Sequence, residues 1–292
     1  MDEPANLSVA KILEMDRRLV VITGASSGIG EAFARRLAPG HDLLLIARRK
    51  ERLQSLADEF QNKFGTQTEI RAADLSNESD LDQLAAELRA RADIALLVNN
   101  AGFGTRGRFW ETDLDSQERM HKLHILATLK LTHAVLGNMV REDFGGIVNV
   151  ASVSAFVHNP GTTSYGATKA WMTAFTEGLY LELRGVRSSV TVQALCPGFT
   201  YSEFHDALGG NRYRAAGPAW WHTAEEVVEA SLEGLRRRKL IVVPGWRYKL
   251  LVAIASKLPI GLRLAAESAT GRARMREMPV HITPPKEIPE GD

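Results

Sequence analysis

The chain has 292 residues, with 36 lysines and arginines against 35 aspartates and glutamates. This length suits one large α/β domain or two small ones, and the balanced charge excludes the broadly basic surface of a nucleic-acid-binding protein. Cys196 is the only cysteine, which excludes an intramolecular disulfide and indicates a reducing compartment, so we expect a cytoplasmic protein.

Residues 1–17 are mostly polar and form a predicted N-terminal extension. Their start, which reads MDEPANLS, lacks a basic stretch followed by an apolar one, so the sequence predicts no signal peptide. Because the chain contains no apolar run of about 18 residues, we also expect no membrane-spanning helix.

Apolar runs alternate with helical patterns between residues 18 and 245, which we interpret as one catalytic domain. The predicted strands are 19–23, 42–47, 68–72, 94–98, 146–150, 190–195 and 240–243. The predicted helices are 28–37, 51–64, 78–91, 116–141, 164–184 and 224–236. Continuous apolar strands are typical of a sheet that is covered on both faces. The alternation therefore predicts an α/β fold, a Rossmann-type doubly wound parallel sheet of about seven strands with helices on both faces.

A glycine-rich segment joins the first predicted strand to the first predicted helix. Residues 23–30 read TGASSGIG, and glycines at this point permit a tight turn and a close approach of the backbone to a pyrophosphate. The N-terminus of the helix favours anions through its free N–H groups and its dipole. The candidate cofactor-binding residues of this loop are Gly24, Ser26, Ser27, Gly28, Ile29 and Gly30.

Two arginines, Arg48 and Arg49, follow the second predicted strand. A site that prefers NAD usually has an acid there for the ribose 2′-hydroxyl, whereas arginine suits a 2′-phosphate through charge-assisted hydrogen bonds. We therefore expect NADP(H) rather than NAD(H). The alternative is that residues 48–52 are only the solvated start of a helix.

Polar groups also follow the third and fourth predicted strands, where open α/β sheets bind ligands. Asp74 and Leu75 come after the third strand, and Asn100, Ala101 and Gly102 come after the fourth. Asp74 is expected to accept a hydrogen bond from the adenine amino group, to cap the helix near Ser76, or to do both.

Tyr165 and Lys169 stand four residues apart in a predicted helix, and Ser152 lies thirteen residues before the tyrosine. Positions i and i+4 share a helix face, and a nearby ammonium lowers the pKa of a phenol. A serine hydroxyl beside them would hold a substrate oxygen. These three groups suit general acid/base catalysis at an alcohol oxygen. The alternative is an ordinary amphipathic helix, in which a tyrosine and a lysine at this spacing also occur.

These motifs, in this order, resemble the short-chain dehydrogenase/reductase family. The matching segments are 23–30, 74–75, 99–102, 149–152, Tyr165 with Lys169, and 197–198. The resemblance implies that Tyr165 is the general acid/base, that Lys169 binds the nicotinamide ribose and tunes the tyrosine, and that Ser152 orients the substrate carbonyl. It places residues 100–102 near the adenine-side ribose and places Pro197, Gly198 and Thr200 beside the nicotinamide.

His124 departs from the family pattern, which has an asparagine at this position of the long helix. In the family that residue supports a water of a proton relay, largely through its main-chain carbonyl. A histidine keeps the carbonyl and adds a titratable ring, so we regard His124 as a candidate catalytic residue, with a packing histidine as the alternative.

Aromatic residues mark the region that would contact substrate, and the resemblance implies that residues 198–223 form a mobile lid over it. Aromatic walls indicate an apolar pocket, although Trp220 and Trp221 would equally suit a core under the loop. The candidate substrate residues are Ser152, Phe103, Phe156, Phe199, Tyr201, Phe204 and Trp221.

Residues 246–292 form a predicted C-terminal extension, apolar and basic over 246–276 and rich in proline and charge over 284–292. The first part favours packing on a neighbouring subunit or on the chain's own domain over peripheral contact with a membrane. The second part is predicted to be disordered.

The sequence predicts an NADP(H)-dependent oxidoreductase that interconverts a ketone or aldehyde and an alcohol. The substrate is expected to be small and apolar, and the protein is expected to be a homodimer or homotetramer that binds neither metal nor nucleic acid. The alternative function is a non-catalytic NADP(H)-binding sensor or scaffold, which would have no need of Ser152, Tyr165 and Lys169 together.

Overall fold

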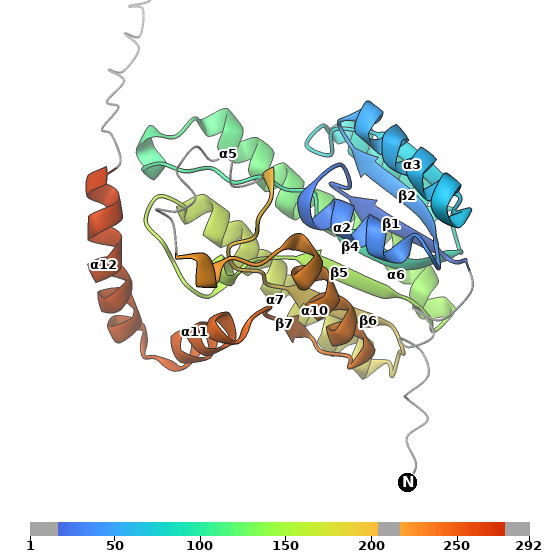
Figure 1. Cartoon of the computed structure of the whole chain (residues 1–292). Helices are drawn as coiled ribbons and strands as arrows, with labels where there is room; N and C mark the ends of the chain where they lie inside the picture. Colours follow the sequence, from blue (N-terminus) through green and yellow to red (C-terminus); the bar gives the residue numbers. More distant parts are fainter. Residues whose placement is uncertain (1–16, 204–216, 278–292) are drawn as a thin grey trace, which may run out of the picture.

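The computed structural model describes residues 17–203 and 217–277. Its centre is a seven-stranded sheet in the order β3-β2-β1-β4-β5-β6-β7, with every strand pair parallel (Figure 1). The strands are β1 (Leu19–Thr23), β2 (Asp42–Ala47), β3 (Thr68–Ala72), β4 (Ile94–Asn99), β5 (Gly146–Val150), β6 (Thr191–Leu195) and β7 (Ile241–Val242). The predicted Rossmann-type fold is confirmed.

Helices cover both faces of this sheet. They are α2 (Gly28–Leu37), α3 (Lys50–Phe64), α4 (Glu78–Arg89), α5 (Leu114–His121), α6 (Thr128–Arg141), α7 (Thr163–Gly185) and α10 (Ala224–Arg236). One core cluster joins the sheet to α2, α3 and α10, and a second joins it to α4, α6 and α7. The strands are therefore apolar at consecutive positions because both of their faces are buried.

The predicted elements agree with the structure to within two residues at each boundary. Local signals explain several of these ends. Gly65 ends α3 in the left-handed conformation, with φ of 65°. A capping box begins α10, where the Thr223 side chain accepts from the Glu226 N–H and the Glu226 carboxylate accepts from the Thr223 N–H.

The long helix predicted over residues 116–141 contains a π-helical turn, Lys122–Ala127, between α5 and α6. Such turns widen a helix locally and often occur at functional sites. The whole helix, Leu114–Arg141, is long and apolar enough to cross a membrane, but it packs across the sheet and against α4 and α7, as a core helix does. The π turn contains His124, which is buried.

Short 3₁₀ helices lie in the described connections at Phe109–Glu111, Val153–Ala155 and Pro218–Trp220. Two further helices, α11 (Trp246–Lys257) and α12 (Ile260–Glu277), follow β7 and lie along the outside of the molecule (Figure 1). Helix α11 packs on the body through Tyr248 and Val252, which join a third core cluster with Ala151 and Cys196.

Candidate active site

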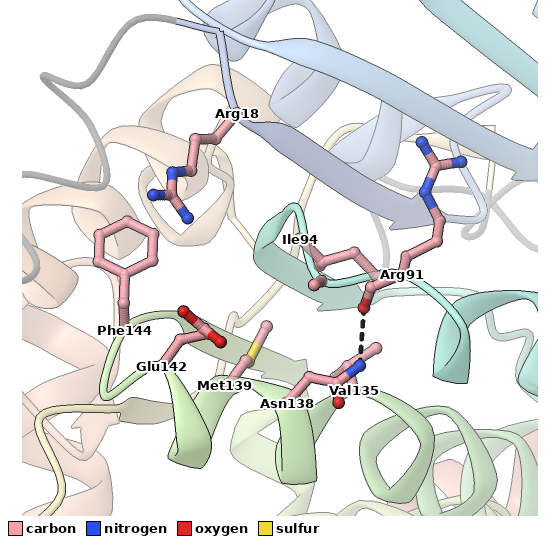
Figure 2. A pocket seen from close by; sticks show the side chains of 9 residues that line it. Arg18, Arg91, Ile94, Val135, Asn138, Met139, Glu142 and Phe144 are labelled. Atoms are coloured by element: carbon pink, nitrogen blue, oxygen red, sulfur yellow. Dashed lines mark hydrogen bonds between the residues drawn. The ribbon is translucent and has the colours of Figure 1, made fainter.

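The strands β1 and β4 are neighbours in the sheet, and the connections that follow them run to opposite sides, so a crevice forms beyond their carboxyl ends. The pocket in Figure 2 lies at the other edge of the sheet, where Ile94 begins β4 and where Asn138 Nδ2 donates to the Arg91 carbonyl at 2.8 Å. The predicted site residues gather at the carboxyl edge, and this edge is the candidate active site.

The glycine loop after β1 is shaped by contacts that admit no side chain. Gly24 has φ of 67°, and a Cβ there would lie 2.8 Å from Asn100 Nδ2. A Cβ on Gly30 would lie 2.3 Å from the Gly24 carbonyl oxygen. Helix α2 begins at Gly28, and the Ser27 side chain makes no capping hydrogen bond with its first N–H groups. The start of α2 therefore offers backbone donors to an anion. Ile29 is partly buried against the first core cluster.

Thr23 ties this loop to the segment after β4. Its Oγ1 accepts from the N–H groups of Asn100 and Ala101, both at 2.9 Å, and donates to the Val98 carbonyl at 3.3 Å. Asn100 Nδ2 in turn donates to the carbonyl oxygens of Thr23 at 2.9 Å and Gly24 at 3.2 Å. No role for Thr23 was predicted from the sequence, because a threonine at a strand end is a common residue.

Arg49, rather than Arg48, is turned toward the glycine loop. Its guanidinium donates to Ser26 Oγ at 2.9 Å and to Ser27 Oγ at 2.9 Å, and it pairs with Glu203 at 2.7 Å. Arg52 approaches the same place and also pairs with Glu203. Arg48 is exposed. The loop therefore combines hydroxyl groups, helix N–H groups and two guanidinium groups, a set that suits a phosphate.

Asp74 lies beside this region, and Leu75 is buried in the core. Asp74 Oδ1 accepts from the Ser76 N–H at 3.0 Å and from the Ser76 hydroxyl at 2.7 Å, whereas the cap of α4 is Asn77. Burial raises the pKa of the Asp74 carboxyl, but the hydrogen bonds from Ser76 and the charge of Arg48 outweigh it and leave that pKa below its usual value. Asp74 therefore remains an ionised acceptor.

Ser152, Tyr165 and Lys169 meet at the carboxyl end of β5. The hydroxyls of Tyr165 and Ser152 share a hydrogen bond, and Ser152 Oγ also accepts from the Ser154 N–H at 3.1 Å. Lys169 Nζ donates to the Val150 carbonyl at 2.7 Å and lies 5.7 Å from the centre of the Tyr165 ring. The predicted triad is therefore assembled, from one strand end and one helix face.

A chain of buried amides positions the helix that carries Tyr165. Asn99 Nδ2 donates to Asn149 Oδ1 at 2.9 Å, and Asn149 Nδ2 donates to Thr176 Oγ1 at 2.9 Å. This chain links the ends of β4 and β5 to α7. Buried polar groups that satisfy each other specify one arrangement strongly, because any shift would leave them without partners.

The expected lowering of the Tyr165 pKa by Lys169 is not found. Burial raises the pKa of Tyr165 to about 12, and the hydrogen bond with Ser152 offsets only part of that rise. Burial also lowers the pKa of Lys169 to about 7. The prediction was wrong here because desolvation of each group outweighs the attraction between an ammonium and a phenolate whose ring lies 5.7 Å away.

His124 lies against the same helix. Its Nδ1 is 2.8 Å from Thr168 Oγ1, and Thr168 Oγ1 donates its own proton to the Tyr165 carbonyl. His124 Nδ1 must therefore donate, which leaves Nε2 unprotonated. Nε2 is buried without a hydrogen-bond partner in the described structure and faces Gly102, where a Cβ would lie 2.5 Å from it. Burial lowers the pKa of His124 well below its usual value, so the ring is neutral.

The aromatic residues of the substrate region form a stack. Trp221 is buried and lies between Phe199, with ring centres 5.2 Å apart, and Tyr201, with ring centres 4.9 Å apart. Phe103 and Phe156 are partly buried near the strand ends. Phe204 lies outside the described residues. Trp221 thus packs as a core under the loop, and its neighbours present the exposed aromatic surface.

Tyr248 of α11 contacts both sides of this region, and no role for it was predicted from the sequence. Its hydroxyl accepts from the Phe199 N–H at 2.9 Å and donates to the Trp220 carbonyl at 2.8 Å. Its ring fills the place that a Cβ of Gly198 would occupy, 2.0 Å from Cζ. No local sequence signal points to Tyr248, because its partners lie about 28 to 49 positions away in the chain.

The remaining predicted residues of this segment lie at the end of β6. The Pro197 carbonyl accepts from the Val153 N–H at 3.0 Å, and Thr200 Oγ1 donates to the Gly198 carbonyl at 3.1 Å. Cys196 precedes them and is buried, and burial raises the pKa of its thiol to about 12. A thiol that stays protonated is a packing group and not a nucleophile.

Comparison with known proteins agrees with this arrangement. The sequence profile of the family described as short chain dehydrogenase matches residues 18–212. Nodulation protein G of Rhizobium sp. is 34% identical over 206 residues, which are 70% of this chain and 82% of that protein.

Two solved structures resemble the whole described fold. A short-chain dehydrogenase from Sphingobium yanoikuyae in complex with NADPH is 34% identical with a TM-score of 0.73, and the match covers 92% of this chain and 99% of that one. A bulky-bulky ketone specific alcohol dehydrogenase from Comamonas testosteroni is 30% identical with a TM-score of 0.70, and the match covers 94% and 100% of the two chains.

Proposed function

Because the chain belongs to the short-chain dehydrogenase/reductase family, we propose that this oxidoreductase interconverts a ketone or aldehyde and an alcohol with NADP(H). The observation that carries the proposal is the hydrogen-bonded pair of Ser152 and Tyr165 hydroxyls beside Lys169, at the carboxyl edge of the sheet. A protein that only bound the cofactor would have no need of this pair.

The residues of the glycine loop suit a dinucleotide. A side chain at Gly24 or Gly30 would clash with neighbouring atoms, so only backbone fits there. A bare backbone lets a pyrophosphate approach the start of α2 closely. Arg49, with the hydroxyls of Ser26 and Ser27, would hold the 2′-phosphate of NADP(H). Asp74 would accept from the adenine amino group, and residues 100–102 would border the ribose. NADPH, when bound, supplies the hydride.

The chain's own residues handle the proton. The Ser152 hydroxyl would hold the substrate oxygen, and Tyr165, protonated because its pKa is about 12, would donate its proton to that oxygen as it gains charge. Lys169 would supply positive charge next to the phenolate that forms. Its ammonium is present below a pH of about 7, so the reduction should be favoured at neutral or lower pH.

His124 acts in this scheme as a positioning residue. Its neutral ring fixes the Thr168 hydroxyl and, through it, the turn of α7 that begins at Tyr165. The unprotonated Nε2 offers an acceptor next to Gly102, where a relay water could bind. The imidazole itself does not titrate in this role.

We propose an apolar substrate, because Phe199 and Tyr201 flank the buried Trp221 beside the site. The structural neighbour from Comamonas testosteroni is a bulky-bulky ketone specific alcohol dehydrogenase, which supports a ketone as the carbonyl substrate. Purified protein should be screened with ketones, aldehydes and alcohols while NADPH absorbance is followed, with Tyr165→Phe as the matched control. Tight NADPH binding without turnover of any of them would instead support the sensor or scaffold.

A homodimer or homotetramer is proposed from the exposed apolar side chains of the long helices, among them Leu126, Leu129 and Leu181. Light scattering on the purified protein would measure the assembly. The cytoplasmic location stays a prediction, as do the division of the chain at residues 17 and 245 and the role of residues 284–292, which lie outside the described structure.

A further inference from the structure

Helices α11 and α12 lie on the outside of the molecule (Figure 1). They carry a cluster of large apolar side chains that are exposed. Their exposed fractions run from 37% at Leu258 to 68% at Trp246. We call this cluster the C-terminal apolar surface, and its members are Trp246, Leu250, Ile254, Leu258, Ile260, Leu262 and Leu264. Clusters of this kind mark a binding surface, whereas single exposed apolar side chains are ordinary.

Within residues 17–203 and 217–277, the chain's own domain does not cover this surface. The face of α11 that packs on the body consists of Tyr248, Val252 and Ala255. Trp246, Leu250 and Ile254 follow each other at intervals of four residues on the opposite face. Leu250, Ile254 and Leu258 also line an open groove of about 390 Å³. The sequence predicted that this segment packs on a neighbouring subunit or on its own domain. One face of α11 packs on its own domain, and the other face is exposed.

The charged residues among these apolar positions are basic. Segment 246–266 contains Arg247, Lys249, Lys257 and Arg263 and neither aspartate nor glutamate, and the next acid, Glu267, accepts from the His158 N–H. Lys249 and Lys257 are exposed on α11, and Lys257 lines the same groove as Leu250 and Ile254. Long basic side chains beside an apolar row can extend to headgroups while the row enters the acyl boundary of a membrane.

A second copy of the chain is a poorer partner for this surface. A two-fold contact brings the same patch of both subunits together. It would bring four ammonium groups, Lys249 and Lys257 of each subunit, into one interface, with no carboxylate from residues 246–266 among them. An anionic lipid surface meets the same cations with opposite charge and accepts the apolar side chains as well.

We propose that the C-terminal apolar surface docks the protein in the plane of a bilayer that contains anionic lipid. The docked helices are joined to the substrate side of the active site. Arg247 Nη1 donates to the Ala219 carbonyl at 2.6 Å, and Glu267 of α12 accepts from the His158 N–H at 3.0 Å. If the proposed ketone reduction holds, on which this step rests, the bilayer is also the reservoir from which an apolar carbonyl substrate reaches Ser152.

Sedimentation of the full chain with lipid vesicles tests the docking directly. We expect wild type to bind phosphatidylcholine vesicles that contain one quarter phosphatidylglycerol, and to bind pure phosphatidylcholine much less. Lys249→Glu/Lys257→Glu should lower the partition coefficient at least ~25-fold, at roughly fivefold per cation removed. Leu250→Glu/Ile254→Glu should lower it at least ~tenfold.

Val186→Glu is the matched control, because Val186 is as exposed as Trp246 but lies at the end of α7, and it should bind as wild type does. Absence of wild-type binding to anionic vesicles would overturn the proposal, as would equal binding by the charge variant, which alters only exposed side chains. The oligomeric mass can also be measured without lipid. If wild type does not bind vesicles and Leu250→Glu/Ile254→Glu has a lower oligomeric mass than wild type, this surface is a subunit contact instead. Vesicle binding is measured without substrate turnover. A lack of vesicle binding and a lack of ketone reduction would therefore be separate results.

Discussion

Replacement of Tyr248 by phenylalanine removes one hydroxyl and keeps the ring that packs on Gly198 and Trp220. The Phe199 N–H and the Trp220 carbonyl each lose a hydrogen bond, of 2.9 Å and 2.8 Å. A hydrogen bond contributes about 0.5–1.5 kcal/mol net, and a buried group without its partner costs about 1–3 kcal/mol. Because Phe199 and Trp220 are only partly buried, we expect a loss of about 2 kcal/mol in the free energy of unfolding.

A loss of that size should lower Tm by roughly 4–8 °C for a domain of this size. It should also raise KM for ketones, because the hydroxyl joins both ends of the substrate segment, while Kd for NADPH stays the same. Urea unfolding and steady-state kinetics measure the two effects. Tyr180→Phe is the control, since its hydroxyl accepts from Arg184 on an exposed helix face, and it should change stability by less than about 0.5 kcal/mol. Equal stability of Tyr248→Phe and wild type would refute this reasoning.

The other predictions concern the cofactor and the proton. Tyr165→Phe should lower turnover roughly 10²–10⁴-fold, while NADPH binding, measured by fluorescence titration, is retained. Turnover as fast as that of wild type would exclude Tyr165 as the general acid. Arg49→Ala should raise Kd for NADPH roughly 10- to 100-fold and leave Kd for NADH nearly unchanged, whereas a larger effect from Arg48→Ala would reverse the assignment. Burial lowers the pKa of Lys169 to about 7, so between pH 7 and its ordinary value of 10.5 the unfolded chain binds the extra proton. The free energy of unfolding should therefore rise with pH from 7 to 9, by up to about 1.4 kcal/mol per unit relative to Lys169→Met. An equal slope in the two proteins would contradict the buried neutral lysine. His124→Asn should keep most activity, and an inflection near pH 7 in the rate profile should persist in it; loss of that inflection would assign the titration to His124.

Much of this protein follows from its sequence because the responsible signals are local. Consecutive apolar residues formed strands buried on both faces, and the glycines of residues 23–30 formed the turn that their spacing predicts. Hydrophobic periodicity and backbone conformation depend on near neighbours in the chain, so strands and turns can be predicted without knowledge of the tertiary structure. The fold was predicted from these patterns and the family from the motifs that resemble it, and both predictions are confirmed.

The remaining features were decided by contacts between residues that are distant in the chain. The sequence does not distinguish Arg48 from Arg49 as the arginine that reaches the glycine loop. The folded structure does, because the Arg49 guanidinium contacts Ser26. Tyr248 became part of the substrate side because α11 folds back over Gly198. The pKa values of Tyr165 and Lys169 depend on burial, which follows from the surrounding fold and cannot be inferred from their spacing of four residues. The sequence alone therefore determined the chemistry that is present, and the tertiary structure decided how each group is oriented and charged, because desolvation and long-range packing arise only in the folded chain.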